Sequence, residues 1–530
     1  MFFLTAGLLL SSLVLGGATS SGFLSEAVLQ LAAIPVLLVG IWRMIDASLH
    51  GQAKLALLFC LGLVLVPLLQ LVPLPSSVWT SLPGREIVVS ALSLSFPDLP
   101  WMPLSLSPRS TWLGLLSLLP PLAIFIAVQQ LSYQERRKLS LLIIVLGIIS
   151  VFLGLLQLMQ GPQSSLRFFE ITNPTEAVGF FANRNHYAAL LYSVLVLAAA
   201  WMFAQLTDIG ISPRAQRGFD ASQVLYMFAG FTVMVVILSG ILMSRSRAGL
   251  GLAIIAFIGI YLMSFSDKGQ ESRKRSSKLI WAASALALVF ALQFALFRIM
   301  DRLGKSVSED LRFAFARVTT EAIWDVMPFG TGIGSFVPTF KLYETTGDLP
   351  GRLYANRAHN DFLEWWLETG GAGILMLSLF VVFFVYRTYQ IWRYPLIGGR
   401  DIDHVLAKAA TIIVPLLLLH SFVDYPLRTT AMLSIMAFTC ALLIKPAYTS
   451  IDEDVLEYSE HPRDTDIGRS KRQSRSARQA AQPPRASGFS QSRSPPSSSQ
   501  QQQPLQLKDT DWPEAWRKSA DKKAKKTNGT

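Results

Sequence analysis

Long apolar runs recur along the chain, separated by polar segments of very different lengths. Twelve of them are close to the roughly 18 to 20 residues that a helix needs to cross a bilayer. They lie at about 2–18, 23–41, 54–72, 111–129, 139–158, 186–205, 223–243, 246–264, 279–298, 371–390, 407–424 and 428–445. The first run lacks the basic flank of a signal peptide, so we predict that it is retained as a helix. The pattern predicts an all-α fold, a polytopic transmembrane helical bundle of about 12 spans.

The basic residues in the polar segments orient the predicted spans. Short segments after even-numbered runs are basic, as in Arg136-Arg137-Lys138, whereas the segments after odd-numbered runs are either very short or long. Because short cytoplasmic loops carry an excess of Lys and Arg, both termini are predicted to be cytoplasmic. The segments 73–110, 159–185 and 299–370 then lie on the outer side. The last of these is long enough to be partly helical.

Composition and charge agree with this class of protein. Of the 530 residues, 51% are hydrophobic and 15% are charged, with a net charge of +12. In a soluble protein this charge would suggest a nucleic-acid partner. Here the basic residues lie mainly in predicted cytoplasmic loops and the tail, so we predict membrane lipid and no nucleic acid as a partner. Residues 446–530 are too polar to form a core and are predicted to be a disordered basic cytoplasmic tail after a membrane domain at 1–445.

Two arginines on the predicted outer side contradict the charge rule. Ser244-Arg245-Ser246-Arg247 lies between two apolar runs with almost no loop to hold it. An arginine near a membrane normally faces a cavity or a partner, or it extends its charge to the interface along its apolar stem. The first interpretation predicts an anionic ligand at Arg245 and Arg247, and the second predicts only anchoring.

Three of the six histidines also map to the outer side, each among polar or charged neighbours. These are His186 beside Arg184, His359 followed by Asn360 and Glu364, and His420 followed by Asp424 and Arg428. If the helix continues to residue 424, the four-residue spacing puts His420 and Asp424 on one face. An ion pair that closes the outer turn is the structural alternative for that pair. For His359 the structural alternative is a helix cap or an interfacial anchor.

Arginine and neutral histidine side chains together suit transfer chemistry on a phosphorylated lipid. Arginine stays charged and binds phosphate oxygens through a bidentate fork, and histidine, with an ordinary pKa of about 6.5, can accept a proton from a hydroxyl group. Cys60 and Cys440 have no metal-ligand spacing, and the predicted outer side has no Asp-x-Asp pair. We therefore predict that arginine rather than a metal neutralises a diphosphate, and that no cofactor is used.

Several segments carry a pattern that can be compared with known families. They are Gly179–Ala188 (GFFANRNHYA), Ser246–Leu250, Pro328–Phe336, Ala358–Leu363 with Glu368–Gly370, and His420–Arg428. Together with Trp101–Pro108, their order and their placement between apolar runs resemble the O-antigen ligase and polymerase family of bacterial envelope glycosyltransferases. The resemblance implies an integral membrane protein of the bacterial inner membrane whose outer side, with the large loop 299–370, faces the periplasm.

The resemblance also implies an activity and roles for particular residues. Members transfer a glycan from undecaprenyl diphosphate to an acceptor without a metal and with inversion. Arg247 would bind the diphosphate, with Arg184 as a second candidate, and His359 would activate the acceptor. Secondary candidates are Arg245, His186, Arg312, Asn360, Glu364, His420, Asp424 and Arg428.

The sequence leaves alternatives open for both the acceptor and the class of reaction. An O-antigen ligase, which uses lipid A core as acceptor, is the leading hypothesis. Relatives with similar motifs polymerise repeat units on a growing glycan or transfer the glycan to protein hydroxyls. A transporter of lipid-linked sugar would place charged residues deep inside several spans, and few are found there. A purely structural protein would leave the outer arginines unexplained.

Overall fold

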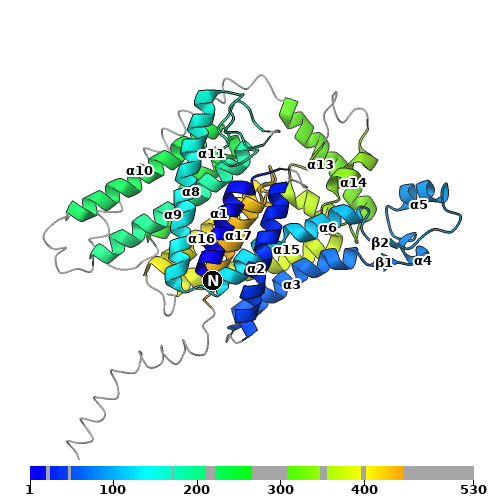
Figure 1. The fold of residues 1–530 in the computed structure, drawn as a ribbon, viewed down its shortest axis with the longest axis horizontal. Coiled ribbons are helices and arrows are strands. Elements are labelled where there is room, and N and C mark those ends of the chain that lie inside the picture. Colours follow the sequence, from blue (N-terminus) through cyan, green and yellow to red (C-terminus); the bar gives the residue numbers. More distant parts are fainter. Residues whose placement is uncertain are drawn as a thin grey trace, which may run out of the picture. The chain divides into compact units, whose positions relative to one another are not determined.

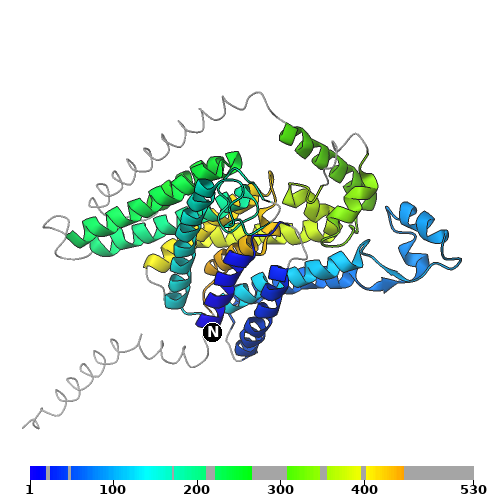
Figure 2. The ribbon, with the colours of Figure 1, turned by 45° about the horizontal axis from the view of Figure 1, so that its top comes forward.

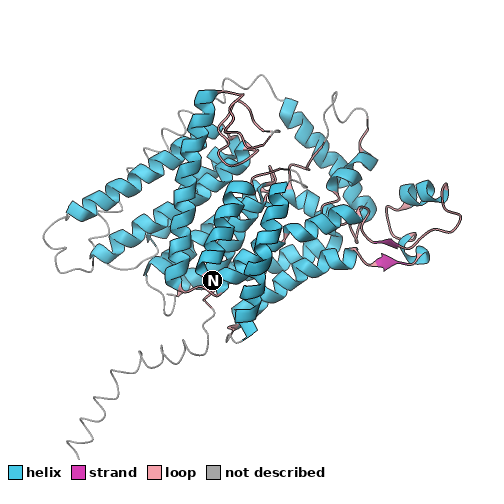
Figure 3. Ribbon diagram, viewed as in Figure 1, coloured by secondary structure: helices cyan, strands magenta, loops and turns pink. Residues whose placement is uncertain are grey.

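The computed structural model describes residues 1–19, 24–45, 49–169, 172–210, 221–265, 307–345, 355–394 and 401–446. This part of the chain is dominated by helices (Figures 1 and 3). Within it, the strands are β1 (Pro73–Leu74) and β2 (Met102–Pro103), which pair antiparallel. The helices are α1 (Phe2–Leu15), α2 (Leu24–Ile45), α3 (Gly51–Gln70), α4 (Ser76–Trp79), α5 (Glu86–Ser93), α6 (Pro108–Ser117), α7 (Leu119–Gln129), α8 (Tyr133–Gln160), α9 (Arg184–Gly210), α10 (Ala221–Ser244), α11 (Arg247–Phe265), α13 (Val307–Val326), α14 (Phe336–Tyr343), α15 (Asp361–Arg393), α16 (Asp401–His420), η2 (Pro426–Arg428) and α17 (Thr430–Leu442).

Seven helical segments among the described residues are long and apolar enough to cross a membrane. Four further apolar helices are shorter, namely α1, α17 and the described parts of α10 and α11. These eleven segments, seven and four together, coincide with eleven of the twelve predicted runs. The remaining run, 279–298, lies outside the described residues. The protein is therefore a helical membrane protein, as the apolar pattern predicted.

Two helix boundaries differ from the prediction, and both bear on the site. The predicted run 371–390 belongs to α15, which begins at Asp361, well before the apolar stretch. The predicted run 407–424 belongs to α16, which ends at His420, where the chain turns toward η2. Asp424 thus lies beyond the end of the helix, and the prediction that helical spacing aligns it with His420 is wrong.

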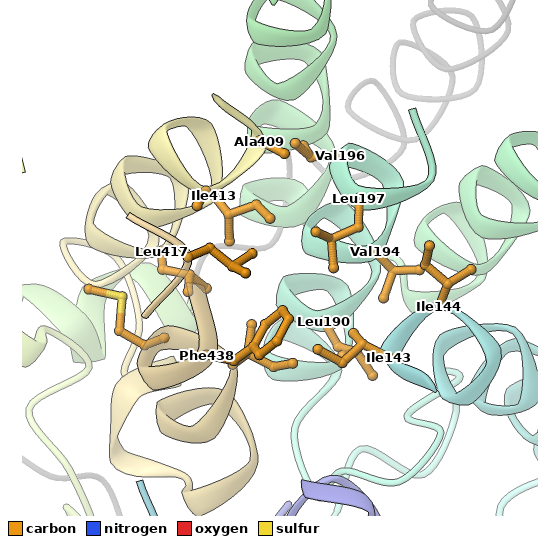
Figure 4. Close-up of a cluster of buried hydrophobic side chains, with 14 of the residues drawn as sticks. Ile143, Ile144, Leu190, Val194, Val196, Leu197, Ala409, Ile413, Leu417 and Phe438 are labelled. Carbon is orange, nitrogen blue, oxygen red and sulfur yellow. The ribbon is translucent and has the colours of Figure 1, made fainter. Parts of the chain in front are cut away.

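The main hydrophobic core surrounds α9, which is apolar on all sides and accordingly buried along its described length. Figure 4 shows Leu190 and Val194 of α9 between Ile143 of α8 and the side chains of α16 and α17, including Ile413 and Phe438. In lipid such packing depends on close fit rather than on exclusion of water. The core therefore gives α9 a fixed position, and the start of α9 at Arg184 carries site residues.

A second, smaller core forms where α13 and α14 pack against the first half of α15 (Figure 2). Phe315 and Val318 of α13, Phe340 of α14 and Leu367 of α15 contribute to it. Among its described residues, the predicted outer loop 299–370 thus contains α13, α14 and the beginning of α15. This core fixes the beginning of α15, which directly follows His359.

Two glycines allow the turn at Gly330 to pack closely against the first half of α15. Gly330 has a φ of +76°, and a Cβ atom there would lie 2.7 Å from the Glu368 carbonyl oxygen. Gly370 has a φ of +58° and interrupts the regular helix. Because only glycine adopts such angles without strain, the two segments can approach closely. Their contact holds Glu368 in the interior, where it joins the ion-pair network described below.

Candidate active site

Asp424 is the centre of a polar cluster drawn from three distant parts of the chain. Its carboxylate is fully buried. One oxygen, Oδ1, lies 3.1 Å from Nδ1 of His359, in the loop before α15. The other, Oδ2, accepts hydrogen bonds from the amides of Asn183, at 3.3 Å, and Asn185, at the start of α9. Three donors therefore surround one carboxylate.

These contacts keep Asp424 ionised. Burial opposes the charged form, but the hydrogen bond to His359 and the neighbouring histidines, His186 among them, favour it more strongly. The pKa of Asp424 consequently lies well below its usual range. An ionised carboxylate at Nδ1 fixes the imidazole tautomer in which Nδ1 carries the proton. The free lone pair of His359 is then on Nε2.

His359 is held in an unusual backbone conformation and remains accessible. Its φ is +51°, in the left-handed region that non-glycine residues rarely adopt and that clusters at functional sites. The ring stacks on Phe315 of α13 at a centroid distance of 5.9 Å and meets Tyr425 edge-on at 4.9 Å. The side chain keeps 23% of its surface exposed. This geometry leaves Nε2 as the ring nitrogen able to accept a proton from a substrate.

His186 and His420 lie in the same cluster but are inaccessible. Both are fully buried. His186 meets the ring of Tyr425 at 4.8 Å, and His420 Nδ1 lies 3.1 Å from the Tyr192 hydroxyl. The three histidines therefore lie around Asp424, and His359 is the one of the three with an exposed side chain.

The hairpin between α10 and α11 presents its two arginines outward. Ser246 is buried, accepts a hydrogen bond from the Gly249 amide at 2.9 Å as the cap of α11, and donates one to Asn185 Oδ1 at 2.8 Å. Arg245 has a φ of +52°, and both Arg245 and Arg247 are exposed. The hairpin is therefore anchored to the polar cluster while its cationic side chains point away from the core.

Arg184 and Arg312, the other two arginine candidates, lie outside this hairpin and have other neighbours. Arg184 forms an ion pair with Glu176, with 2.6 Å between Nη1 and Oε1. A phosphate group at Arg184 would have to share or displace that carboxylate. Arg312, on α13, lies within electrostatic range of His420.

Residues on both sides of His359 belong to an ion-pair network of two arginines and three buried carboxylates. Arg428 Nη1 lies 2.7 Å from Glu368 Oε2 and 3.5 Å from Glu364 Oε1, and its Nε lies 3.4 Å from Asp361 Oδ1. Arg357 Nη1 adds a 2.7 Å contact to Glu364. Burial opposes the charge of Arg428, but its carboxylate neighbours outweigh that effect and raise its pKa above the ordinary value.

The network fixes the backbone on both sides of the His359–Asp424 pair. The Ala358 amide donates to Glu364 at 3.0 Å, and the Asp361 amide donates to the Ser421 carbonyl at 2.8 Å. Asn360 caps α15 by accepting from the Phe362 and Leu363 amides. Asn360, Glu364 and Arg428, three of the secondary candidates, therefore hold the backbone around the His359–Asp424 pair.

Sequence reasoning missed the two asparagines, Tyr425 and Glu176 as members of the site. The Asn-Arg-Asn-His motif was visible, but an amide becomes informative only when its partner is known, and Asp424 is 239 residues from Asn185. Among the residues that the structure describes, no group of three or more His, Cys, Asp or Glu side chains is arranged to hold a metal ion.

The fold and the cluster define a helical membrane protein with an accessible His–Asp pair beside exposed arginines. Residues 232–378 match the family model described as O-antigen ligase. The match confirms the resemblance carried by the motifs, and with the apolar helices it indicates a bacterial membrane protein. It includes Arg247 and His359 but ends before Asp424. A search of curated proteins finds no match to the chain.

Proposed function

We propose that the protein is an integral membrane glycosyltransferase that moves a glycan from undecaprenyl diphosphate to an acceptor hydroxyl at the periplasmic face of the inner membrane. The observation that carries this proposal is the accessible His359, paired with the buried Asp424 and connected through polar side chains to the exposed arginine hairpin. The match to the family model supports the class of reaction and the lipid-linked glycan as its donor.

The geometry gives each group a role in a single displacement. Arg247 binds the donor diphosphate, with Arg245 and Arg184 nearby as further cations. His359 Nε2 takes the proton of the acceptor hydroxyl as its oxygen attacks the anomeric carbon. The bond from that carbon to the diphosphate breaks, and the electron pair leaves on the lipid diphosphate, so the anomeric configuration inverts. Asp424 stabilises the imidazolium that forms. No metal takes part in these steps.

We propose lipid A core as the acceptor, with the family's repeat-unit polymerases and protein O-oligosaccharyltransferases as the alternatives. A deletion strain separates these activities. Loss of a ligase leaves polymer on the carrier lipid, whereas loss of a polymerase leaves single repeat units. Loss of transfer to a protein acceptor leaves lipopolysaccharide unchanged, and loss of a transporter leaves the glycan on the cytoplasmic side.

The proposal also requires a topology that labelling can test. We propose that residues 1–445 form the membrane domain, that 299–370 is periplasmic and that the tail 446–530 is cytoplasmic. In a variant lacking Cys60 and Cys440, single cysteines at positions 247 and 359 should react with an impermeant reagent from the periplasm, and one in the tail should not. Opposite labelling of positions 247 and 359 would refute the shared site.

Arg247→Lys is expected to raise the KM for the donor about tenfold or more. Lysine keeps the charge but cannot form the bidentate fork, and a tenfold change corresponds to the loss of about 1.4 kcal/mol from this charge-assisted contact. The measurement is transfer from synthetic undecaprenyl-diphosphate glycan in proteoliposomes. Arg317→Lys, in an exposed pair with Glu321 on α13, is the matched control. An unchanged donor KM in the Arg247 variant would remove Arg247 from the donor site.

A further inference from the structure

A continuous chain of hydrogen bonds connects the arginine hairpin to His359. Ser246 Oγ donates to Asn185 Oδ1 at 2.8 Å, Asn185 Nδ2 donates to Asp424 Oδ2, and Asp424 Oδ1 contacts His359 Nδ1 at 3.1 Å. Its four members come from the start of α11, the start of α9, the turn after α16 and the loop before α15. Asn185, the second member, joins the hairpin to the carboxylate.

The chemistry of the partners fixes the orientation of the Asn185 amide. An ionised carboxylate can only accept hydrogen bonds, so the NH₂ group must face Asp424. The carbonyl oxygen then faces Ser246, whose hydroxyl can donate to it. The backbone amide of Asn185 is held as well, because it donates to Asn183 Oδ1 at 2.8 Å. The Asn185 amide is therefore held at both its oxygen and its nitrogen, and the backbone of the residue is held as well.

Asn183 contacts the same carboxylate oxygen but cannot replace Asn185. Its amide lies farther from Asp424, at 3.3 Å, and 3.4 Å from His186 Nε2. None of the contacts described for Asn183 reaches the hairpin. Asn185 therefore combines two tasks: it sets the rotation of the Asp424 carboxylate, and it sets the distance from that carboxylate to the segment that carries Arg247.

We propose that Asn185 is a positioning residue that aligns the Asp424–His359 base with the diphosphate-binding hairpin. This inference rests on the proposed function. Asn185 holds Asp424 Oδ2, which leaves Oδ1 in place to orient His359. Its hydrogen bond with Ser246 keeps His359 at a fixed distance from a donor bound at Arg247. Loss of the amide should lower kcat roughly 10- to 100-fold, the effect of a misplaced catalytic group, without raising the donor KM.

Asn185→Asp and Asn185→Leu distinguish this role from simple packing. In Asn185→Asp, the protonated form of the new side chain matches the amide, because its OH can donate to Asp424 and its carbonyl can accept from Ser246. The ionised form instead faces the Asp424 carboxylate, and two adjacent carboxylates resist ionising together. Lowering the pH from neutrality should therefore raise the activity of Asn185→Asp relative to Asn185→Leu. His186, His359, His420 and Tyr425 surround Asp424 in both variants, so the comparison at each pH removes their contributions.

The experiment measures kcat and KM of the full-length protein in proteoliposomes across this pH range. Thermal unfolding in detergent shows whether each variant is folded. Ser246→Ala supplies a second variant: combined with Asn185→Leu it should lower kcat no further than Asn185→Leu alone, because both break the same chain. Loss of the Ser246 cap of α11 is followed separately, by thermal unfolding. Two results overturn the proposal, namely wild-type kcat in both Asn185 variants and an Asn185→Asp activity that parallels Asn185→Leu at every pH. His359→Ala in the same series separates the ideas: normal transfer there refutes the base role of His359, whereas no transfer by the wild-type protein refutes the proposed function itself.

Discussion

Replacement of His359 by alanine is expected to lower kcat for glycan transfer roughly 10²- to 10⁴-fold, the range that a positioned general base contributes. His359 is the accessible member of the histidine cluster, and Asp424 holds its Nδ1 so that Nε2 can accept the proton. The donor KM should change little, because the proposed diphosphate site consists of the arginines and not of His359. The measurement is initial transfer rate in proteoliposomes at saturating donor and acceptor.

A second variant tests the proposed role of His359 as a base. Asp424→Asn keeps the shape of the side chain, but an amide NH₂ turned toward His359 would favour the tautomer with the proton on Nε2. A base in the wrong tautomer loses most of its activity, so kcat should fall by a comparable factor, roughly 10³ to 10⁴. His50→Ala, at the start of α3 and outside the cluster, should behave as wild type. Normal transfer by a well-folded His359→Ala protein would contradict the assignment.

The helices could be predicted from the sequence because the membrane leaves few alternatives. A chain in lipid must satisfy its backbone hydrogen bonds internally, so a long apolar run becomes a helix. The ends of α15 and α16 were less predictable. Polar residues such as Asp361 extend α15 beyond its apolar part, because the ion-pair network and the Asn360 cap stabilise the additional turns. Hydropathy contains no information about those contacts.

Several residues of the polar cluster could be named as candidates from the sequence, but their pairing could not. The neighbours of His359 marked it as a candidate, whereas sequence spacing joined Asp424 to His420. In the structure Asp424 contacts His359, which is 65 residues away, because the chain turns after His420. The pairing of Arg184 could not be predicted either, because its partner Glu176 lies in the loop before α9 and helical spacing does not relate the two residues. Contacts between separate segments depend on the packing of α9, α15 and α16, which no local pattern specifies.

Arg428→Gln is expected to destabilise the protein by about 3–5 kcal/mol, the usual cost of removing one partner from a buried ion pair. Arg428 contacts Asp361, Glu364 and Glu368, all buried, and without it only Arg357 remains within the network to oppose three carboxylates. The loss of stability caused by Arg428→Gln should become smaller as the pH is lowered, because protonation of a carboxyl group reduces the repulsion among the three carboxylates. Thermal or denaturant unfolding in detergent at several pH values measures this effect.

The matched control is Arg317→Gln, which removes an arginine from the exposed Arg317–Glu321 pair on α13. Exposed pairs spaced four residues apart on a helix contribute at most about 0.5 kcal/mol, so its unfolding midpoint should stay near that of wild type. Arg428→Lys should be intermediate, because one ammonium group retains the charge but cannot reach three carboxylates as the guanidinium does. Because the network holds the segments on both sides of His359 and Asp424, transfer should fall in the order of lost stability. An Arg428→Gln protein as stable as the Arg317→Gln control would mean that the carboxylates are neutralised in another way, and that the pair is positioned without the network.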